Sequence, residues 1–178
     1  KKIGTHLGGW TPFRFDVTEE ILGPAPAGGH EIRVRLDEKV GHNTQGFLPI
    51  VAPHFGGIWQ EVKLIVVPDP YFDDLSLRAT GNARTGMLDI EVPLSAKGPL
   101  PPETVDVSVR LRGSEEWIRI KARASRDSNV LKASVDVPGA KLWGPGEPNL
   151  YDVLLELPAA ATGRAGDRAS ARAAFRMV

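Results

Sequence analysis

Hydrophobic and polar residues alternate along most of the chain from residue 72 onward. In residues 103–112, for example, every second position is apolar from Val105 to Leu111. Successive side chains of a strand point to opposite faces, so this period of two indicates half-buried strands. The ranges predicted as strands are 72–79, 86–94, 103–112, 116–123, 130–137, 150–158 and 168–177. Seven short strands within about 100 residues, separated by glycine, proline and asparagine clusters, predict an immunoglobulin-like β-sandwich.

The alternation also predicts which residues of this sandwich face its core. Residues 168–177 are alanine-rich, which is typical of helices, but their alternation and position favour a last strand. The side chains expected inward, or close to the core, are Val107, Val109, Ile120, Val135, Val153 and Leu155.

The first third of the chain has the pattern of a different unit. Its predicted strands are 13–17, 31–37, a short one near residue 50, and 60–67. A helical turn is expected only at residues 17–22, where Asp16 or Thr18 could cap it. Pro68 and Pro70 cannot donate ladder hydrogen bonds, so we place the domain boundary there, with domains at 1–68 and 69–178.

Four strands are fewer than a closed β-sandwich of the jelly-roll type requires, which is about eight. We therefore expect Phe13, Phe15, Ile32 and Val34 to be partly exposed. An open strand edge would also allow pairing with a second copy, so a homo-oligomer is a partner the pattern allows.

Composition narrows the function classes. Of the 178 residues, 42% are hydrophobic and 25% charged, as in ordinary globular proteins, and the formal net charge is 0. We expect no basic surface for nucleic acid, no disulfides because cysteine is absent, and no cofactor. No apolar run is long enough to span a bilayer, residues 1–9 do not resemble a signal peptide, and the compartment stays open.

Four stretches resemble glycoside hydrolase family 2, the β-galactosidase, β-glucuronidase and β-mannosidase group. The stretch at residues 4–21 is similar to the family's glycine-rich turn, aromatic residue, Pro-Phe and Asp-Val-Thr. Residues 56–64, "GGIWQEVKL", resemble the last strand of its sugar-binding jelly roll, with Trp59 covering that core. Residues 142–151 resemble a Leu-Trp-x-Pro-x-x-Pro-x-Leu-Tyr stretch, and 173–178 a Gly-Phe-Arg step with Ala174 at the glycine.

The resemblance implies an all-β chain: the C-terminal part of a jelly-roll sugar-binding sandwich, followed by an immunoglobulin-like β-sandwich. In the family, catalysis belongs to a third domain, a (β/α)8 barrel of about 250 residues. Retaining hydrolysis there needs two carboxyl groups about 5 Å apart. The family's Asn-Glu pair is absent from this sequence, so we expect an interior segment that holds no catalytic residue and whose partner is the barrel of the parent chain.

Residues 41–57 are the best candidate for substrate contact, because the resemblance implies a loop there that reaches the active-site mouth. The family often has an acidic residue in this loop, but none occurs between Gly41 and Gly57. The polar side chains that could replace it are Asn43, Gln45 and His54, and Trp10 could stack on a sugar ring. A plain ordered loop and a packed tryptophan are the alternatives.

Other candidate sites have simpler explanations. The four histidines match no local metal-ligand spacing, so no metal is expected. Glu19–Glu20 and Glu115–Glu116 are adjacent in sequence and are expected to be solvated surface residues rather than catalytic pairs. The glycine-rich residues 144–149 precede a strand rather than a helix, which excludes a phosphate loop.

These observations favour a non-catalytic segment that supports the barrel and shapes the substrate entrance. The alternatives are a stand-alone carbohydrate-binding module and an adhesion sandwich without a ligand. The sequence does not identify the sugar.

Overall fold

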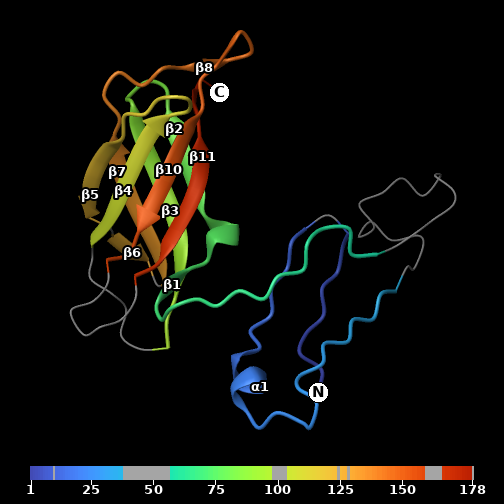
Figure 1. Ribbon diagram of the computed structural model, residues 1–178. Coiled ribbons are helices and arrows are strands. Elements are labelled where there is room, and N and C mark those ends of the chain that lie inside the picture. The colour runs from blue at the N-terminus through green and yellow to red at the C-terminus, as the bar shows by residue number, and fades with distance from the viewer. Residues whose placement is uncertain are drawn as a thin grey trace, which may run out of the picture. The chain divides into compact units, whose positions relative to one another are not determined.

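The computed structural model describes residues 1–9, 11–37, 57–97, 104–123, 125–127, 129–158 and 166–177, with the backbone alone at 125–127. The chain divides into two compact units, Lys1–Leu64 and Ile65–Val178. The prediction of an all-β protein is confirmed, since strands form nearly all the regular structure of the described residues (Figure 1). No helix within those residues is long and apolar enough to cross a membrane.

The second unit is a sandwich of two main sheets (Figure 1). The larger sheet has the order β12 (Phe175–Arg176), β2 (Arg78–Asn82), β3 (Met87–Ser95), β7 (Val130–Asp136), β6 (Ser125–Asp127), and β1 (Tyr71–Phe72) also pairs with β3. The smaller sheet has the order β11 (Arg168–Ala173), β10 (Tyr151–Glu156), β4 (Thr104–Leu111), β5 (Ile118–Arg123). A hairpin joins β8 (Trp143–Gly144) to β9 (Glu147–Pro148). The described pairs are antiparallel, except that β12 runs parallel to β2.

The core lies between the two sheets, where the alternating apolar side chains of both inner faces meet. Leu88, Val107 and Leu155 are each at most 1% exposed. Burying such a side chain stabilises the fold by about 1.5–3 kcal/mol. The predicted inward residues are confirmed: Val107, Val109, Val135, Val153 and Leu155 are buried, and Ile120 packs against them.

Two segments that were each predicted as one continuous strand are interrupted in the structure. Residues 72–79 are split by the 3-10 turn η2 (Asp74–Ser76), where the Ser76 amide donates to the Asp73 carbonyl at 3.1 Å. Residues 168–177 are split at Ala174, because β11 pairs in the smaller sheet and β12 in the larger. Alternation alone cannot reveal such a break, since the apolar period continues across a strand that changes sheets.

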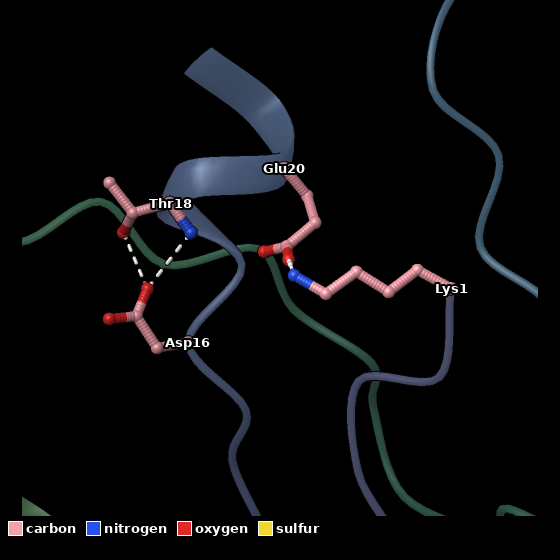
Figure 2. A network of polar contacts seen from close by, with 4 residues as sticks. All are labelled: Lys1, Asp16, Thr18 and Glu20. Atoms are coloured by element: carbon pink, nitrogen blue, oxygen red, sulfur yellow. Dashed lines mark hydrogen bonds and ion pairs between the residues drawn. The ribbon is translucent and has the colours of Figure 1, made fainter. Parts of the chain in front are cut away.

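The first unit contains one regular element among its described residues, the helix α1 (Thr18–Leu22). The Asp16 carboxylate accepts hydrogen bonds from the Thr18 amide at 2.9 Å and the Thr18 hydroxyl at 2.6 Å (Figure 2). It thereby satisfies an amide that has no partner within the helix. The N-cap residue itself is Val17, whose side chain makes no capping hydrogen bond, so the prediction that Asp16 or Thr18 is the cap was wrong. Asp16 bonds the first helical amide from the position before the cap.

The strands predicted in this first third are wrong wherever the chain is described. Residues 13–17, 31–37 and 60–67 form no strand, and the strand near residue 50 lies outside the described residues. A strand needs a hydrogen-bonded neighbour, and these segments pair with no described one. The predicted exposure is confirmed, at 47% for Phe13, 41% for Phe15, 73% for Ile32 and 58% for Val34.

Candidate functional site

The residues predicted to contact sugar lie outside the described part of the structure. This holds for Trp10, Asn43, Gln45 and His54, whose role stays a prediction. Trp59, expected to cover a core, is instead 64% exposed, and its indole N–H donates to the Gly9 carbonyl at 3.2 Å. That expectation was wrong because the segment around Trp59 forms no strand over a packed layer.

The loop at residues 141–151, which carries the Leu-Trp-Gly-Pro sequence and the β8–β9 hairpin, is held by several side-chain hydrogen bonds. Tyr151 is 4% exposed, and its hydroxyl accepts a hydrogen bond from the Lys141 amide at 2.7 Å. The Asn149 side chain donates to the Leu142 carbonyl at 2.9 Å. Side-chain contacts to the backbone therefore close the loop on itself, which reduces the conformations it can adopt.

This loop packs against Phe175, which belongs to the other motif near the C-terminal end. The rings of Tyr151 and Phe175 meet edge to face with centroids 5.1 Å apart, a favourable arrangement for aromatic pairs. Leu142 also forms a parallel bridge with Phe175. Two motifs more than twenty residues apart thus meet at one end of the sandwich, where Figure 1 shows β8 close to the C-terminus. We call the set Leu142, Asn149, Tyr151 and Phe175 the end cluster.

A glycine makes room for the end cluster. A Cβ atom added to Gly81 would lie 2.7 Å from the Ala174 carbonyl oxygen and 2.8 Å from the Phe175 ring. Both contacts are closer than real Cβ atoms show, so β12 can approach β2 only because residue 81 lacks a side chain. Gly81 could not be recognised from the sequence, because "TGNARTG" has the pattern of a turn and nothing local marks the approach of a distant strand.

Asp167 is a second residue that sequence reasoning missed. Its carboxylate accepts a hydrogen bond from the Phe72 amide at 2.7 Å, and its carbonyl accepts one from the Leu157 amide at 2.8 Å. It therefore ties β1 and the end of β10 to the start of β11. The sequence around Asp167 gives little indication of this role, because Asp167 lies in a run of small and charged residues with no apolar period.

The described residues provide few groups for acid–base chemistry. A shallow hollow of about 390 Å³ is lined by Thr80, Gly81, Asn82, Ala83, Arg84, Asp89, Arg176 and Met177. Asp89 is its one acid, and it accepts a hydrogen bond from the Ser134 hydroxyl. Retaining glycoside hydrolysis needs two carboxyl groups about 5 Å apart, so this hollow does not fit that chemistry. The described residues contain no cluster of three metal ligands.

The ionic pairs of the first unit are exposed. The Lys1 ammonium binds the Glu20 carboxylate (Figure 2), and this hydrogen bond lowers the pKa of Glu20 and raises that of Lys1. The Glu31 carboxylate accepts a hydrogen bond from Arg33 at 2.8 Å and raises the pKa of that guanidinium. Glu115 and Glu116 are exposed, as expected for solvated residues. None of these groups faces a second carboxylate poised for catalysis.

Comparison with known proteins gives relatives that are much longer than this chain. A curated protein described as a putative beta-glucuronidase, from Formosa agariphila, is 24% identical over 165 residues, which is 88% of this chain and 18% of that protein. A beta-glucuronidase from Bacteroides uniformis matches with a TM-score of 0.38 and 21% identity, over 62% of this chain and 13% of that one. An FMN-binding beta-glucuronidase from Facaelibacterium prausnitzii matches with a TM-score of 0.35 and 24% identity, over 61% and 17%.

The family comparison is the decisive one. The profile of the family described as Glycosyl hydrolases family 2 matches residues 71–176. That match begins at β1 and ends at β12, so it takes in each strand described for the sandwich together with the end cluster. The chain belongs to glycosyl hydrolases family 2.

Proposed function

We propose that this chain is a non-catalytic segment of a family 2 glycosyl hydrolase, which supports the catalytic barrel and shapes the substrate entrance. The observation that carries the proposal is the position of the family match, which coincides with the two-sheet sandwich. The space between those sheets is filled by apolar side chains, so the described part of the sandwich holds no cavity for an active site between its sheets.

The two units take the roles that the sequence resemblance implies. The second unit is an immunoglobulin-like sandwich, and its two facing sheets, one of six described strands and one of four with nearly all pairs antiparallel, support this assignment. The first unit is the C-terminal part of a jelly-roll sugar-binding domain. Its exposed apolar residues, among them Phe13 and Ile32, support the absence of the remaining strands.

The parent enzyme would be a retaining hydrolase of O-glycosyl bonds. The chain spans 18% of the curated relative's length, which leaves room for a barrel elsewhere in the parent. The relatives carry the description beta-glucuronidase, which favours a β-glucuronide among the substrates of the family.

The end cluster is the support surface in this proposal. Around its buried ring of Phe175, three apolar side chains stay exposed, with 44% of Leu142, 37% of Trp143 and 76% of Met177 accessible. Exposed apolar groups on a rigid base are typical of surfaces that contact another domain. The hydrogen bonds of Tyr151 and Asn149 keep the loop that presents two of them in place.

An activity assay tests the non-catalytic assignment. The purified chain is expected to release no nitrophenol from the nitrophenyl β-glucuronide, β-galactoside or β-mannoside. Turnover that survives a second purification and elutes with the protein would contradict the proposal.

A stand-alone carbohydrate-binding or adhesion module is the alternative, favoured by the exposed indole of Trp143. The residues encoded after Val178 distinguish the hydrolase segment from the stand-alone module. A barrel with an Asn-Glu pair and a second glutamate supports the segment, whereas a stop codon together with glycan binding by this chain supports the module.

A further inference from the structure

The smaller sheet, β11–β10–β4–β5, has an outer face whose composition is set by the strand register. Val105, Val107 and Val109 of β4 point to the core, so the residues between them point outward. Their cross-strand partners lie on the same face. The outward residues are Thr104, Asp106, Ser108, Arg110, Arg119, Lys121, Arg123, Asp152, Leu154, Glu156, Arg168, Ser170 and Arg172.

This outer face is basic although the whole chain is neutral. It carries six basic and three acidic residues, a net charge of +3, in a chain whose formal net charge is 0. The outer face of β12, β2, β3 and β7 in the other sheet carries three basic and three acidic residues. The net charge of zero, from which we expect no basic surface for nucleic acid, does not reveal this excess, because composition averages over faces that the register separates.

In two of the three ion pairs described for this face the cation is more accessible than the carboxylate, whereas Arg110 and Asp152 are similarly exposed, at 33% and 30%. The Arg168 side chain is 76% exposed and its partner Glu156 is 31% exposed, with 2.7 Å between Arg168 Nε and the carboxylate. Lys121 is 70% exposed and Asp106 is 42% exposed. A molecule approaching Lys121 and Arg168 therefore meets more accessible positive than negative charge.

The spacing of the cations along and across the strands suits an extended ligand. Arg119, Lys121 and Arg123 alternate along β5 with about 6.6–6.8 Å between neighbours, and the four strands are together about 14 Å wide. Arg110 lies in the middle, with its guanidinium 4.5 Å from the centre of the Trp117 ring and its Nε 3.2 Å from the Asp152 carboxylate. The ring and the ion pair hold this guanidinium in place.

Protection of an open sheet edge explains only part of the pattern. Charged residues on edge strands prevent pairing with other chains, which accounts for the basic residues of β5 and β11. Arg110 belongs to the interior strand β4, however, and the excess of cations on one face contrasts with the balance on the other. Exposed ion pairs contribute little to stability, so a ligand can exchange with them at small cost.

We propose that the outer face of β11–β10–β4–β5 binds a polyanionic glycan, a polysaccharide that carries repeated carboxylate or sulfate groups. Guanidinium groups bind carboxylate and other oxyanions through paired hydrogen bonds, which fits the predominance of arginine over lysine here. The chain belongs to a family of glycosyl hydrolases, which favours a glycan over a nucleic acid. The face would hold an acidic polymer against the enzyme, separately from the site of hydrolysis.

Affinity electrophoresis of the full chain tests the proposal. The probes are heparin, which is sulfated, polygalacturonate, which is carboxylated, neutral dextran, and a single-stranded DNA oligonucleotide. We expect retardation by one or both acidic glycans at about 50 mM salt, with weakening as salt rises, and none by dextran.

Two charge-matched double variants locate the binding. Arg119→Gln with Arg172→Gln removes two cations from the basic face, and Arg78→Gln with Arg84→Gln removes two exposed arginines elsewhere in the same unit. We expect about tenfold weaker glycan binding for the first variant and less than a twofold change for the second. Chemical-shift mapping of the unaltered protein should place the largest changes on β5 and β11, and this result does not depend on either variant folding.

Three outcomes would overturn the inference. These are equal losses in both double variants, DNA binding as tight as glycan binding at the same salt concentration, and absence of glycan binding at low salt. Each is distinct from failure of the proposed function, since nitrophenyl glycoside turnover measures a different property.

Discussion

Residues 31–37 and 104–111 have the same sequence pattern but form different structures: the first segment forms no strand, and the second forms β4. Each alternates aliphatic with polar or charged residues: "EIRVRLD" in the first unit and "TVDVSVRL" in the second. Val107 is 1% exposed in β4, which pairs with β5 on one side and β10 on the other. Val34 is 58% exposed in a segment that forms no strand.

The contrast shows what alternation does and does not determine. It specifies which side chains would share a face, which is a local property of the sequence. It does not supply the neighbouring strand or the second layer, and these come from segments far along the chain. The partners of β4 on its two sides are 9 to 19 residues away at β5 and about 40 residues or more away at β10, all within the second unit.

Hydrogen exchange should give the largest difference between the two regions. The amides of residues 105–111 are expected to exchange only through unfolding of the second unit, whereas those of 13–17 and 32–36 should exchange close to the unprotected rate. The ratio should reach about 10³ or more for a stable domain. Equal protection of both sets in a verified monomer would show that the first unit forms a complete sandwich.

Matched leucine truncations should give the next largest difference. Leu155 is 0% exposed and Leu36 is 54% exposed. Leu155→Ala leaves a cavity and should lower the free energy of unfolding of the second unit by about 2–5 kcal/mol. Leu36→Ala removes an exposed side chain of the first unit and should change the measured free energy of unfolding by less than about 0.5 kcal/mol. Urea unfolding followed by tryptophan fluorescence measures both. Similar losses for the two variants would contradict the separation into a packed and an unpacked region.

Gly81→Ala probes the joint between β2 and β12. The new Cβ would overlap the Ala174 carbonyl and the Phe175 ring, so we expect a loss of about 1–3 kcal/mol. Gly146→Ala is the control, because a Cβ there meets nothing within 4 Å and the residue has no positive φ. Thermal unfolding should separate the two, and a fully stable Gly81→Ala protein would mean that β12 does not need this close approach.

The sequence predicted the sandwich far better than the site. Its inward residues were correct because each buried strand repeats one local rule. The predicted cap at Asp16 or Thr18 was wrong by one residue, since the N-cap is Val17, although Asp16 does bond the first helical amide. Gly81 and Asp167 were missed because their partners, Phe175 and Phe72, lie more than 90 residues away. The candidate sugar contacts Trp10, Asn43, Gln45 and His54 stay predictions, since they lie outside the described residues.

The smallest expected effect concerns the exposed contacts of the first unit. The hydrogen bond from Lys1 holds the pKa of Glu20 below its ordinary value of 4.5, and the reverse effect holds the pKa of Lys1 above 10.5. Because the pKa of Glu20 is lowered, the contribution of the pair is complete above pH 4.5 and is lost as the pH falls through the lowered pKa. Because the pKa of Lys1 is raised, the contribution is present below pH 10.5 and is lost as the pH rises through that pKa.

A titration of the Glu20 carboxyl carbon by NMR measures this effect directly. In the unaltered chain the midpoint should lie below 4.5, and Lys1→Gln should return it toward that value. Lys2→Gln is the control, because it removes the same charge one residue away and leaves the Lys1–Glu20 contact in place. A depressed midpoint in all three proteins would mean that the general field of the unit, rather than this one hydrogen bond, acts on Glu20. The first unit would then be more compact than its exposed apolar residues indicate, and its contrast with the second unit would narrow.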